Sequence, residues 1–304
     1  MKIAIIGAGA MGSIYGGYLS KHNEVYLVDN NQELVDTINK DGLKLEENGS
    51  DVLYRPKAVK STDGIGKVDL IILFVKSLYS RVALQENKGI IDSNTYVMTL
   101  QNGAGHEDIL SEVVPIERII IGTTEDNGAI IKLGHVRHGG TGRTNIGMLA
   151  DDKNDMLNAL KKCFDECGFE TIVQGNIQKL IWDKLFTNVS LSAVTGVLQV
   201  KMGFIAANKS AWNLTKQLVK EAIVVSKAMG LVFDEKTVLA KVKKASEDSP
   251  NGCTSIYTDL NNGRLTEVDT ISGSVVSAAK KYGVEVPSHV FIVNMVHAME
   301  QRNN

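Results

Sequence analysis

Cysteine is scarce in this sequence, and its count is odd: Cys163, Cys167 and Cys253 stand among 304 residues. Cys163 and Cys167 lie one helical turn apart, but no second pair accompanies them at the spacing of a zinc site. A secreted disulfide framework needs more cysteines, so we expect reduced thiols, a cytoplasmic location and no metal centre.

A strong charge of one sign is also lacking. The 33 Lys and Arg residues are scattered among 35 Asp and Glu residues, and the formal net charge is -2. Proteins that bind nucleic acid collect basic side chains along the phosphates. We therefore expect no nucleic-acid partner.

Long apolar runs, internal repeats and low-complexity segments are missing as well. No run approaches the roughly 18 to 20 residues of a membrane span, and a strand pattern begins after two residues, which leaves no room for a signal peptide. We expect no membrane association. With 43% hydrophobic and 22% charged residues, the chain has the composition of a globular protein with a sizeable core.

Short apolar runs alternate with amphipathic stretches from Met1 to about residue 150. The runs are KIAIIGAG, EVYLVD, VDLIILFVK, TYVMTLQNG and RIIIGTT. Such continuous Val/Ile/Leu runs are typical of parallel strands that helices cover on both faces, and the alternation predicts a doubly wound α/β domain of Rossmann type. The glycine-rich segment 128–148 predicts an antiparallel edge or hairpin that closes this domain.

From residue 174 onward the segments are long and helically periodic, with few strand signals. This change predicts an all-helical second domain. We place the dinucleotide-binding domain at 1–171 and the helical substrate or dimerisation domain at 172–304, so the expected fold class is α/β with an all-helical C-terminal domain.

The segment GAGAMG directly follows the first apolar run and predicts a dinucleotide site. Gly7 would make a tight turn, Gly9 would let the backbone approach a pyrophosphate, and Gly12 would let the helix meet the strand. The phosphates would lie at the helix N-terminus, which includes Ala10 and Met11.

Asp29 ends the second apolar run, about 20 residues further on, where a carboxylate accepts hydrogen bonds from ribose hydroxyls and repels a 2′-phosphate. Asn30 follows it, and the run VDNNQE contains no Arg or Lys to bind that phosphate. NAD(H) is therefore favoured over NADP(H). Lys76 and the pair Asn102–Gly103 end the next two strands, where open α/β sheets bind ligands, so we expect them in the same crevice.

The stretch IWDKLFTNVSLSAVTG, residues 181–196, carries Lys184 and Asn188 one turn apart. At about 100° per residue the two share a stripe with apolar neighbours. The stripe also holds Ile177, Ile181, Leu191 and Thr195, and the opposite arc holds Lys179, Asp183, Thr187 and Ser190. We expect Lys184 to point inward, and because a buried ammonium is costly, this predicts a chemical role for it.

With these pieces in place, the chain resembles the ketopantoate reductase family along its whole length. The segments that carry the resemblance are IAIIGAGAMGS, ILFVKS, TLQNGAGHED, GHVRHGGTGRTNIG, IQKLIWDKLFTNVSLSAVTG, TSIYTDLNNGRLTEVDTISG and KKYGVEVPSH. The resemblance implies hydride transfer from a nicotinamide to a small 2-oxo acid, a place in pantothenate biosynthesis, and a homodimer built on the helical domain.

The resemblance also implies residue roles. Lys184 matches the family's catalytic lysine, Asn188 and Asn102 match its substrate-contacting asparagines, Ser255 matches a serine that helps hold the substrate carboxylate, and Glu267 matches its active-site glutamate. A lysine at the carbonyl oxygen can stabilise the developing negative charge and donate the proton, and a nearby glutamate would keep it charged. In addition, Lys76 matches a lysine near the cofactor.

Two positions depart from the family pattern. Ser192 and Ala193 stand where many members have an asparagine and a proline, and Asn30 stands where many NADPH-using members have an arginine. Both changes fit a branch resembling the NAD-linked D-2-hydroxyacid dehydrogenases of the D-mandelate type, with Ser192 facing the substrate. The expected activity is 2-dehydropantoate 2-reductase or, alternatively, D-mandelate or D-2-hydroxyisovalerate dehydrogenase.

Two further alternatives remain open. A β-hydroxyacid dehydrogenase can share the GAGAMG loop, although IWDKLFTN lacks the glycine-rich helix start of that family's lysine. A redox sensor that binds dinucleotide without turnover is the other. His106, His135 and His138 have no metal-ligand spacing, and we interpret them as surface residues or residues that support the site.

Overall fold

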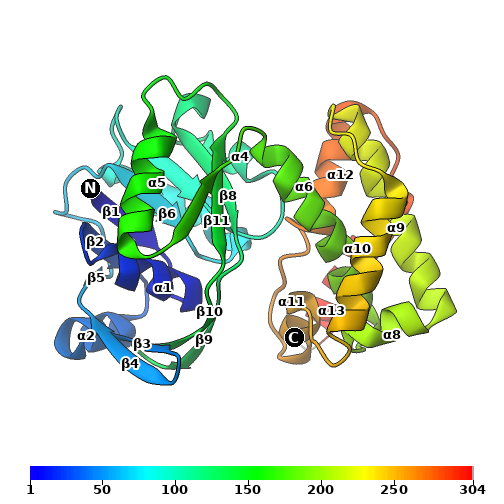
Figure 1. Cartoon of the computed structure of the whole chain (residues 1–304), viewed down its shortest axis with the longest axis horizontal. Helices are drawn as coiled ribbons and strands as arrows, with labels where there is room; N and C mark the ends of the chain where they lie inside the picture. The colour runs from blue at the N-terminus through cyan, green and yellow to red at the C-terminus, as the bar shows by residue number, and fades with distance from the viewer. Residues whose placement is uncertain (303–304) are drawn as a thin grey trace. The chain divides into compact units, whose positions relative to one another are not determined.

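The computed structural model describes residues 1–302, and the chain divides into two compact units (Figure 1). The first unit comprises Met1–Gln101 and His106–Ile177, and the second comprises Asn102–Gly105 and Gln178–Asn304. None of the helices formed by residues 1–302 has the length and apolarity that a membrane crossing requires.

An eight-stranded sheet with the order β12-β11-β8-β7-β6-β1-β2-β5 forms the centre of the first unit. Its strands are β1 (Lys2–Ile6), β2 (Glu24–Val28), β5 (Lys57–Val59), β6 (Leu70–Leu73), β7 (Tyr96–Thr99), β8 (Ile119–Thr124), β11 (Arg143–Met148) and β12 (Glu170–Val173). The six strands from β5 to β8 are parallel. The chain first builds outward from β1 through β2 to β5, then returns to β6 on the other side, so the strand order reverses beside β1. Open α/β sheets bind ligands at such a point.

The predicted apolar runs form β1, β2, β6, β7 and β8, as expected for strands that are buried on both faces. All residues of β6 and β7 are buried. The covering helices are α1 (Ala10–Leu19), α2 (Gln32–Asp41), α3 (Ser80–Glu86), α4 (His106–Leu110) and α5 (Met156–Cys167), with short 3₁₀ turns η1 (Ser77–Tyr79), η2 (Lys88–Ile90) and η3 (Ile116–Arg118). The doubly wound Rossmann-type prediction is confirmed, and because β12 ends at Val173, the sheet continues beyond residue 171.

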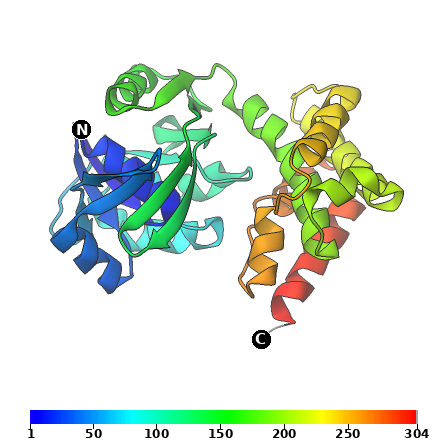
Figure 2. The same ribbon diagram turned by 60° about the horizontal axis from the view of Figure 1, so that its bottom comes forward.

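A second, four-stranded sheet has the order β4-β3-β10-β9. It consists of β3 (Leu43–Glu47), β4 (Ser50–Tyr54), β9 (Asn127–Lys132) and β10 (His135–Gly140), and Figures 1 and 2 show the blue β3–β4 pair beside the green β9–β10 pair. The β9–β10 hairpin and the antiparallel pairing of β11 with β8 confirm the expectation for residues 128–148. The sequence did not predict β3, β4, β5 or β12.

The second unit is all-helical over its described residues, as predicted. Its elements are α6 (Ile177–Thr187), the π-helical turn η4 (Asn188–Ser192), α7 (Ala193–Leu198), α8 (Met202–Ala207), α9 (Lys209–Ala228), α10 (Glu235–Asp248), α11 (Ser255–Asn261), α12 (Ser272–Tyr282) and α13 (Pro287–Gln301). Asn208 caps the long helix α9, because its side chain accepts hydrogen bonds from the N–H groups of Ser210 and Ala211. Its buried face, including Leu218, packs in the core of this unit.

Candidate active site

The glycines of the GAGAMG turn differ in what surrounds them. Gly7 has φ +100°, and a Cβ added there would lie 2.6 Å from the backbone nitrogen of Val75. A Cβ on Gly12 would overlap the carbonyl oxygen of Gly7, whereas a Cβ on Gly9 would have no atom within 4 Å. This geometry fits a tight turn at Gly7, close packing at Gly12 and an open approach for a ligand at Gly9.

A cavity of about 470 Å³ opens in the first unit at the carboxyl ends of β1, β2, β5 and β6. Its lining comprises Ile6, Gly7, Gly9, Val28, Asp29, Asn30, Lys60, Phe74, Val75, Lys76, Tyr79, Val82, Ala83, Glu86 and Asn87. Four of the predicted cofactor residues are among these. In residues 1–302 the lining does not include Ala10, Met11, Gly12 or Asn102; the first three instead form the first turn of α1, where helical N–H groups lack intrahelical partners.

Asp29 is held in place by two backbone groups. Its Oδ2 accepts a hydrogen bond from the N–H of Ala8 at 2.9 Å, and its Oδ1 accepts one from the N–H of Asn31 at 3.0 Å. Asn31, rather than Asp29, caps α2 by accepting from the N–H of Leu34. A carboxylate has about four lone-pair positions, so both oxygens of Asp29 keep capacity for ribose hydroxyls.

Two residues near the cavity were not predicted from the sequence. Lys60 lines the cavity because it follows β5, which pairs with β2. The strand β5 has only three residues, and so short a strand gives little signal in the sequence. Gln101 donates from Nε2 to the carbonyl oxygen of Val75 at 2.6 Å and to Ser80 Oγ at 2.9 Å. It thereby fixes the turn that leads into Lys76, which is half-buried and lines the cavity.

In the second unit, the prediction that Lys184 points inward is wrong, because its side chain is exposed. The buried face of α6 is formed by Trp182, Leu185 and Phe186 and continues to Val189, which is the i, i+3, i+4, i+7 pattern of a core-facing helix.

Ser190, predicted on the solvent arc, is also buried and bonds the carbonyl oxygen of Phe186 at 2.5 Å. The apolar members of the predicted stripe, Ile177, Ile181 and Leu191, are buried as expected, and so is Thr195. The solvent arc ends at Thr187 because the π-helical turn η4 rotates the residues beyond Asn188, and residues 189–196 are buried on every side.

The other substrate-site candidates also belong to the second unit. Asn188 is half-buried at the start of η4, and Ser192 is buried at its end. Ser255 is exposed in the first turn of α11, where the cap is Thr254, which accepts from the N–H of Tyr257 at 3.3 Å. The hydroxyl of Ser255 is therefore not needed as a helix cap.

Glu267 is half-buried in the turn before α12 and does not begin a helix. The segment Asn102–Gly105 packs on this same turn: the N–H of Ala104 donates to the carbonyl oxygen of Thr270 at 3.0 Å, and Gly103 has φ +102° against Thr270. Two segments far apart in sequence, carrying Asn102 and Glu267, are thus held together.

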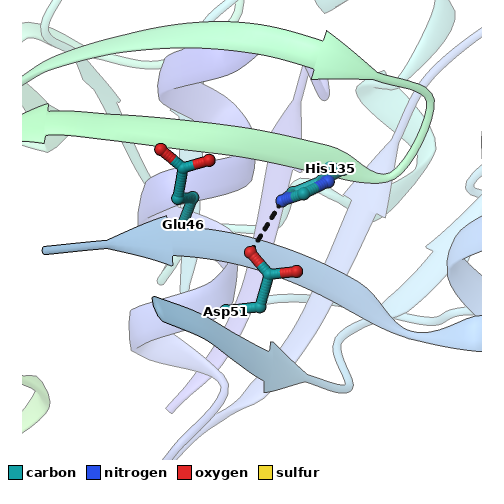
Figure 3. A group of neighbouring side chains, drawn as sticks. All are labelled: Glu46, Asp51 and His135. Atoms are coloured by element: carbon teal, nitrogen blue, oxygen red, sulfur yellow. Dashed lines mark hydrogen bonds and ion pairs between the residues drawn. The ribbon is translucent and has the colours of Figure 1, made fainter. Parts of the chain in front are cut away.

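The histidines were expected either at the surface or in support of the site, and the structure excludes a surface position for two of them. His106 and His138 are buried, and His138 bonds both Asp126 Oδ1 at 3.0 Å and the Tyr18 hydroxyl at 3.1 Å. His135 bonds Asp51 Oδ1 at 2.9 Å on the small sheet (Figure 3).

The ligand atoms of Glu46, Asp51 and His135 lie within 4.8 Å of one another, as a metal ion would require. However, Arg137 already pairs with Glu46 at 2.5 Å, and His135 with Asp51. One ion pair and one hydrogen bond therefore already engage these groups, so we assign no metal to the cluster.

Comparison with known proteins identifies both parts of the chain. The family model "Ketopantoate reductase PanE/ApbA" matches residues 3–151, and "Ketopantoate reductase PanE/ApbA C terminal" matches residues 176–300. The chain is 33% identical to the 2-dehydropantoate 2-reductase of Lactococcus lactis subsp. lactis over 308 residues, which cover 99% of this chain and 98% of that protein. It is 32% identical to the enzyme of the same name from Pyrococcus horikoshii, with the same coverage of both chains.

A solved structure of D-mandelate dehydrogenase with NADH and anilino(oxo)acetate is similar as well. It is 34% identical, superposes with a TM-score of 0.90, and the match covers 99% of this chain and 98% of that one. From the matched models and the full-length similarity, we conclude that the chain belongs to the ketopantoate reductase family.

Proposed function

We propose that this chain is a nicotinamide-dependent oxidoreductase that reduces a branched 2-oxo acid to its D-2-hydroxy acid, with 2-dehydropantoate as the first candidate substrate. The observation that carries the proposal is the cavity beside β1, with its open approach at Gly9 and the anchored carboxylate of Asp29. Relatives that match nearly the whole chain are 2-dehydropantoate 2-reductases.

The residues around the cavity suit a dinucleotide, which when bound supplies the hydride for the reduction. Gly9 leaves room for a pyrophosphate, and the free N–H groups at the start of α1 favour its negative charge. Asp29 would accept hydrogen bonds from the ribose hydroxyls and repel a 2′-phosphate. We therefore propose that NAD(H) is favoured over NADP(H).

In the proposed mechanism, Lys184 donates a proton to the carbonyl oxygen of the 2-oxo acid as negative charge develops there. Glu267 would stabilise the charged form of Lys184. Asn188 and Asn102 would orient the substrate, and Ser255 and Ser192 would hold its carboxylate or side chain. The exposure of Lys184 removes the burial cost inferred from the sequence, so its ammonium form needs no compensation for desolvation.

A second candidate is an NAD-linked D-2-hydroxyacid dehydrogenase of the D-mandelate type. Asp29 favours it, as does Ser192, which is small and buried where many family members have asparagine. The similarity to a D-mandelate dehydrogenase solved with NADH points the same way.

Steady-state rates with ketopantoate, 2-oxoisovalerate and phenylglyoxylate, each with NADH and NADPH, separate the candidates. Preference for ketopantoate supports the first, and preference for phenylglyoxylate or 2-oxoisovalerate supports the second. Tight NADH binding without turnover of any of the three would instead favour a redox sensor.

We also propose a homodimer built on the second unit. An apolar groove of about 570 Å³ lies between α7, α9 and α13, and Leu214 and Phe291 on it are 46% and 65% exposed. Such exposed apolar surface marks interaction sites. Light scattering after size exclusion should show a dimer, which Phe291→Glu should dissociate; a monomeric wild type would contradict the proposal.

For location, we propose the cytoplasm. The three cysteines are free, as expected in a reducing compartment. Labelling of all three thiols in protein isolated without reductant would test this, and a disulfide found there would contradict it.

A further inference from the structure

The residues next to Asp29 in the sequence include no Lys or Arg, but strand pairing brings the ammonium group of Lys60 to the same cavity. Val28 of β2 stands opposite Val59 of β5, and the N–H of Asp29 donates to the carbonyl oxygen of Val59 at 3.1 Å. The residue that follows Val59 is Lys60. It therefore leaves the sheet beside Asp29 and Asn30, and all three line the same cavity.

The two lysines at the ends of β5 differ in their partners. Lys57 pairs with Glu24 at 2.7 Å and lies over the ring of Tyr26, 5.0 Å from its centroid. Lys60 is exposed, and across residues 1–302 no hydrogen bond or ion pair engages its ammonium group. A flexible point charge of this kind suits a phosphate, which lysine binds without strict geometry.

The negative charge of Asp29 is the reason why a 2′-phosphate in this cavity would need a cation such as Lys60. Because its oxygens are held by the N–H groups of Ala8 and Asn31, the carboxylate cannot readily turn away from a phosphate entering the cavity. Glu86 adds a second carboxylate to the lining. A 2′-phosphate would therefore meet net negative charge unless a cation from another strand neutralised it.

We propose that Lys60 sets the cofactor specificity of this chain by pairing with the 2′-phosphate of NADP(H), so that the site accepts NADP(H) as well as the favoured NAD(H). Asp29 binds the ribose hydroxyls of one cofactor, and Lys60 binds the phosphate of the other. This inference rests on the dinucleotide site proposed above and concerns only its ribose end.

Calorimetric titration of the full-length protein with NADH and with NADPH, in the absence of any 2-oxo acid, tests the proposal directly. Lys60→Ala should weaken NADPH binding about tenfold, as expected for losing one charge-assisted contact, and leave NADH binding within about twofold. Lys60→Arg should retain NADPH binding. Lys57→Ala, which removes the other lysine of β5, is the matched control and should change neither affinity.

Ionic strength offers a second readout. Raising the salt concentration should weaken NADPH binding more than NADH binding in the wild type, because an exposed ion pair is screened. In Lys60→Ala this difference should become smaller.

Wild-type protein that binds NADH but not NADPH, or a Lys60→Ala variant that changes both affinities equally or neither, would overturn the role of Lys60 while leaving the proposed oxidoreductase intact. Wild-type protein that binds neither cofactor would overturn the proposed function itself, and this inference with it.

Discussion

The two units build their candidate sites from different parts of the chain. In the first, backbone groups form most of the site: Gly7 turns at φ +100°, and N–H groups of Ala8 and Asn31 hold Asp29 in place. In the second, side chains on helices and turns carry the candidate chemistry, and their directions depend on the helix register. A site made from backbone can be predicted from residue spacing, whereas a site made from helix side chains depends on packing.

The sharpest test of the second unit is Lys184→Ala. If the amine donates the proton, kcat should fall by about 10² or more while NADH binding stays nearly intact. Lys179→Ala removes another exposed lysine of α6 and should leave turnover unchanged. Near-normal kcat in Lys184→Ala would reject the proposed role.

For the first unit, the pair Gly12→Ala and Gly9→Ala tests whether backbone geometry makes the site. The added methyl at Gly12 would overlap the Gly7 carbonyl, so we expect a loss of about 1–3 kcal/mol in the free energy of unfolding and weaker NADH binding. The methyl at Gly9 would enter open space, so thermal stability should be kept while NADH binding weakens. Calorimetric unfolding and NADH titration measure both, and a Gly12→Ala protein as stable as wild type would contradict the packing argument.

The substitution Asp29→Asn tests whether the negative charge of this side chain, in addition to its shape, selects between NADH and NADPH. The amide oxygen can still accept from Ala8, but the negative charge is gone, so the affinity for NADPH relative to NADH should rise about tenfold. Asp36→Asn on the exposed face of α2 is the control. An unchanged ratio in Asp29→Asn would mean that Asp29 does not select the cofactor.

The smallest expected effect is a pH response of the second unit through His289. Burial lowers the pKa of this side chain, whose Nε2 donates to the carbonyl oxygen of Leu218 at 2.9 Å. Below about pH 6.5 the unfolded chain binds a proton that the folded unit resists. Stability should therefore fall with falling pH, by at most about 1.4 kcal/mol per pH unit.

Urea unfolding of wild type and His289→Asn across this pH range tests the effect. The variant should lose the histidine's share of the pH dependence, and identical pH profiles would contradict the assignment.

Strand and helix patterns explain how much of the fold was predictable. The strands β1, β6 and β7 can be recognised in the sequence because both of their faces are covered, so nearly every residue in them is apolar. β4 is exposed at all positions but Tyr54, and β5 has only three residues, so neither contains a clear period. Their pairing partners, rather than their own residues, make them strands.

The candidate site divides in the same way. Spacing alone predicted the glycine turn and Asp29, because strand, turn and helix must follow one another at short range for the chain to turn at Gly7. It failed for Lys184, because the core of the second unit packs on Trp182, Leu185 and Phe186, on a different side of α6, and for Gln101, whose hydrogen bonds cross to another strand end.

Local sequence was thus sufficient for the Rossmann-type start and the helical second unit. The tertiary structure alone decided which side chains lie next to one another. Lys60 lies 31 residues from Asp29, and only the parallel pairing of β5 with β2 brings them to one cavity. Hydrogen bonds between strands act across any sequence separation, so no local pattern records them.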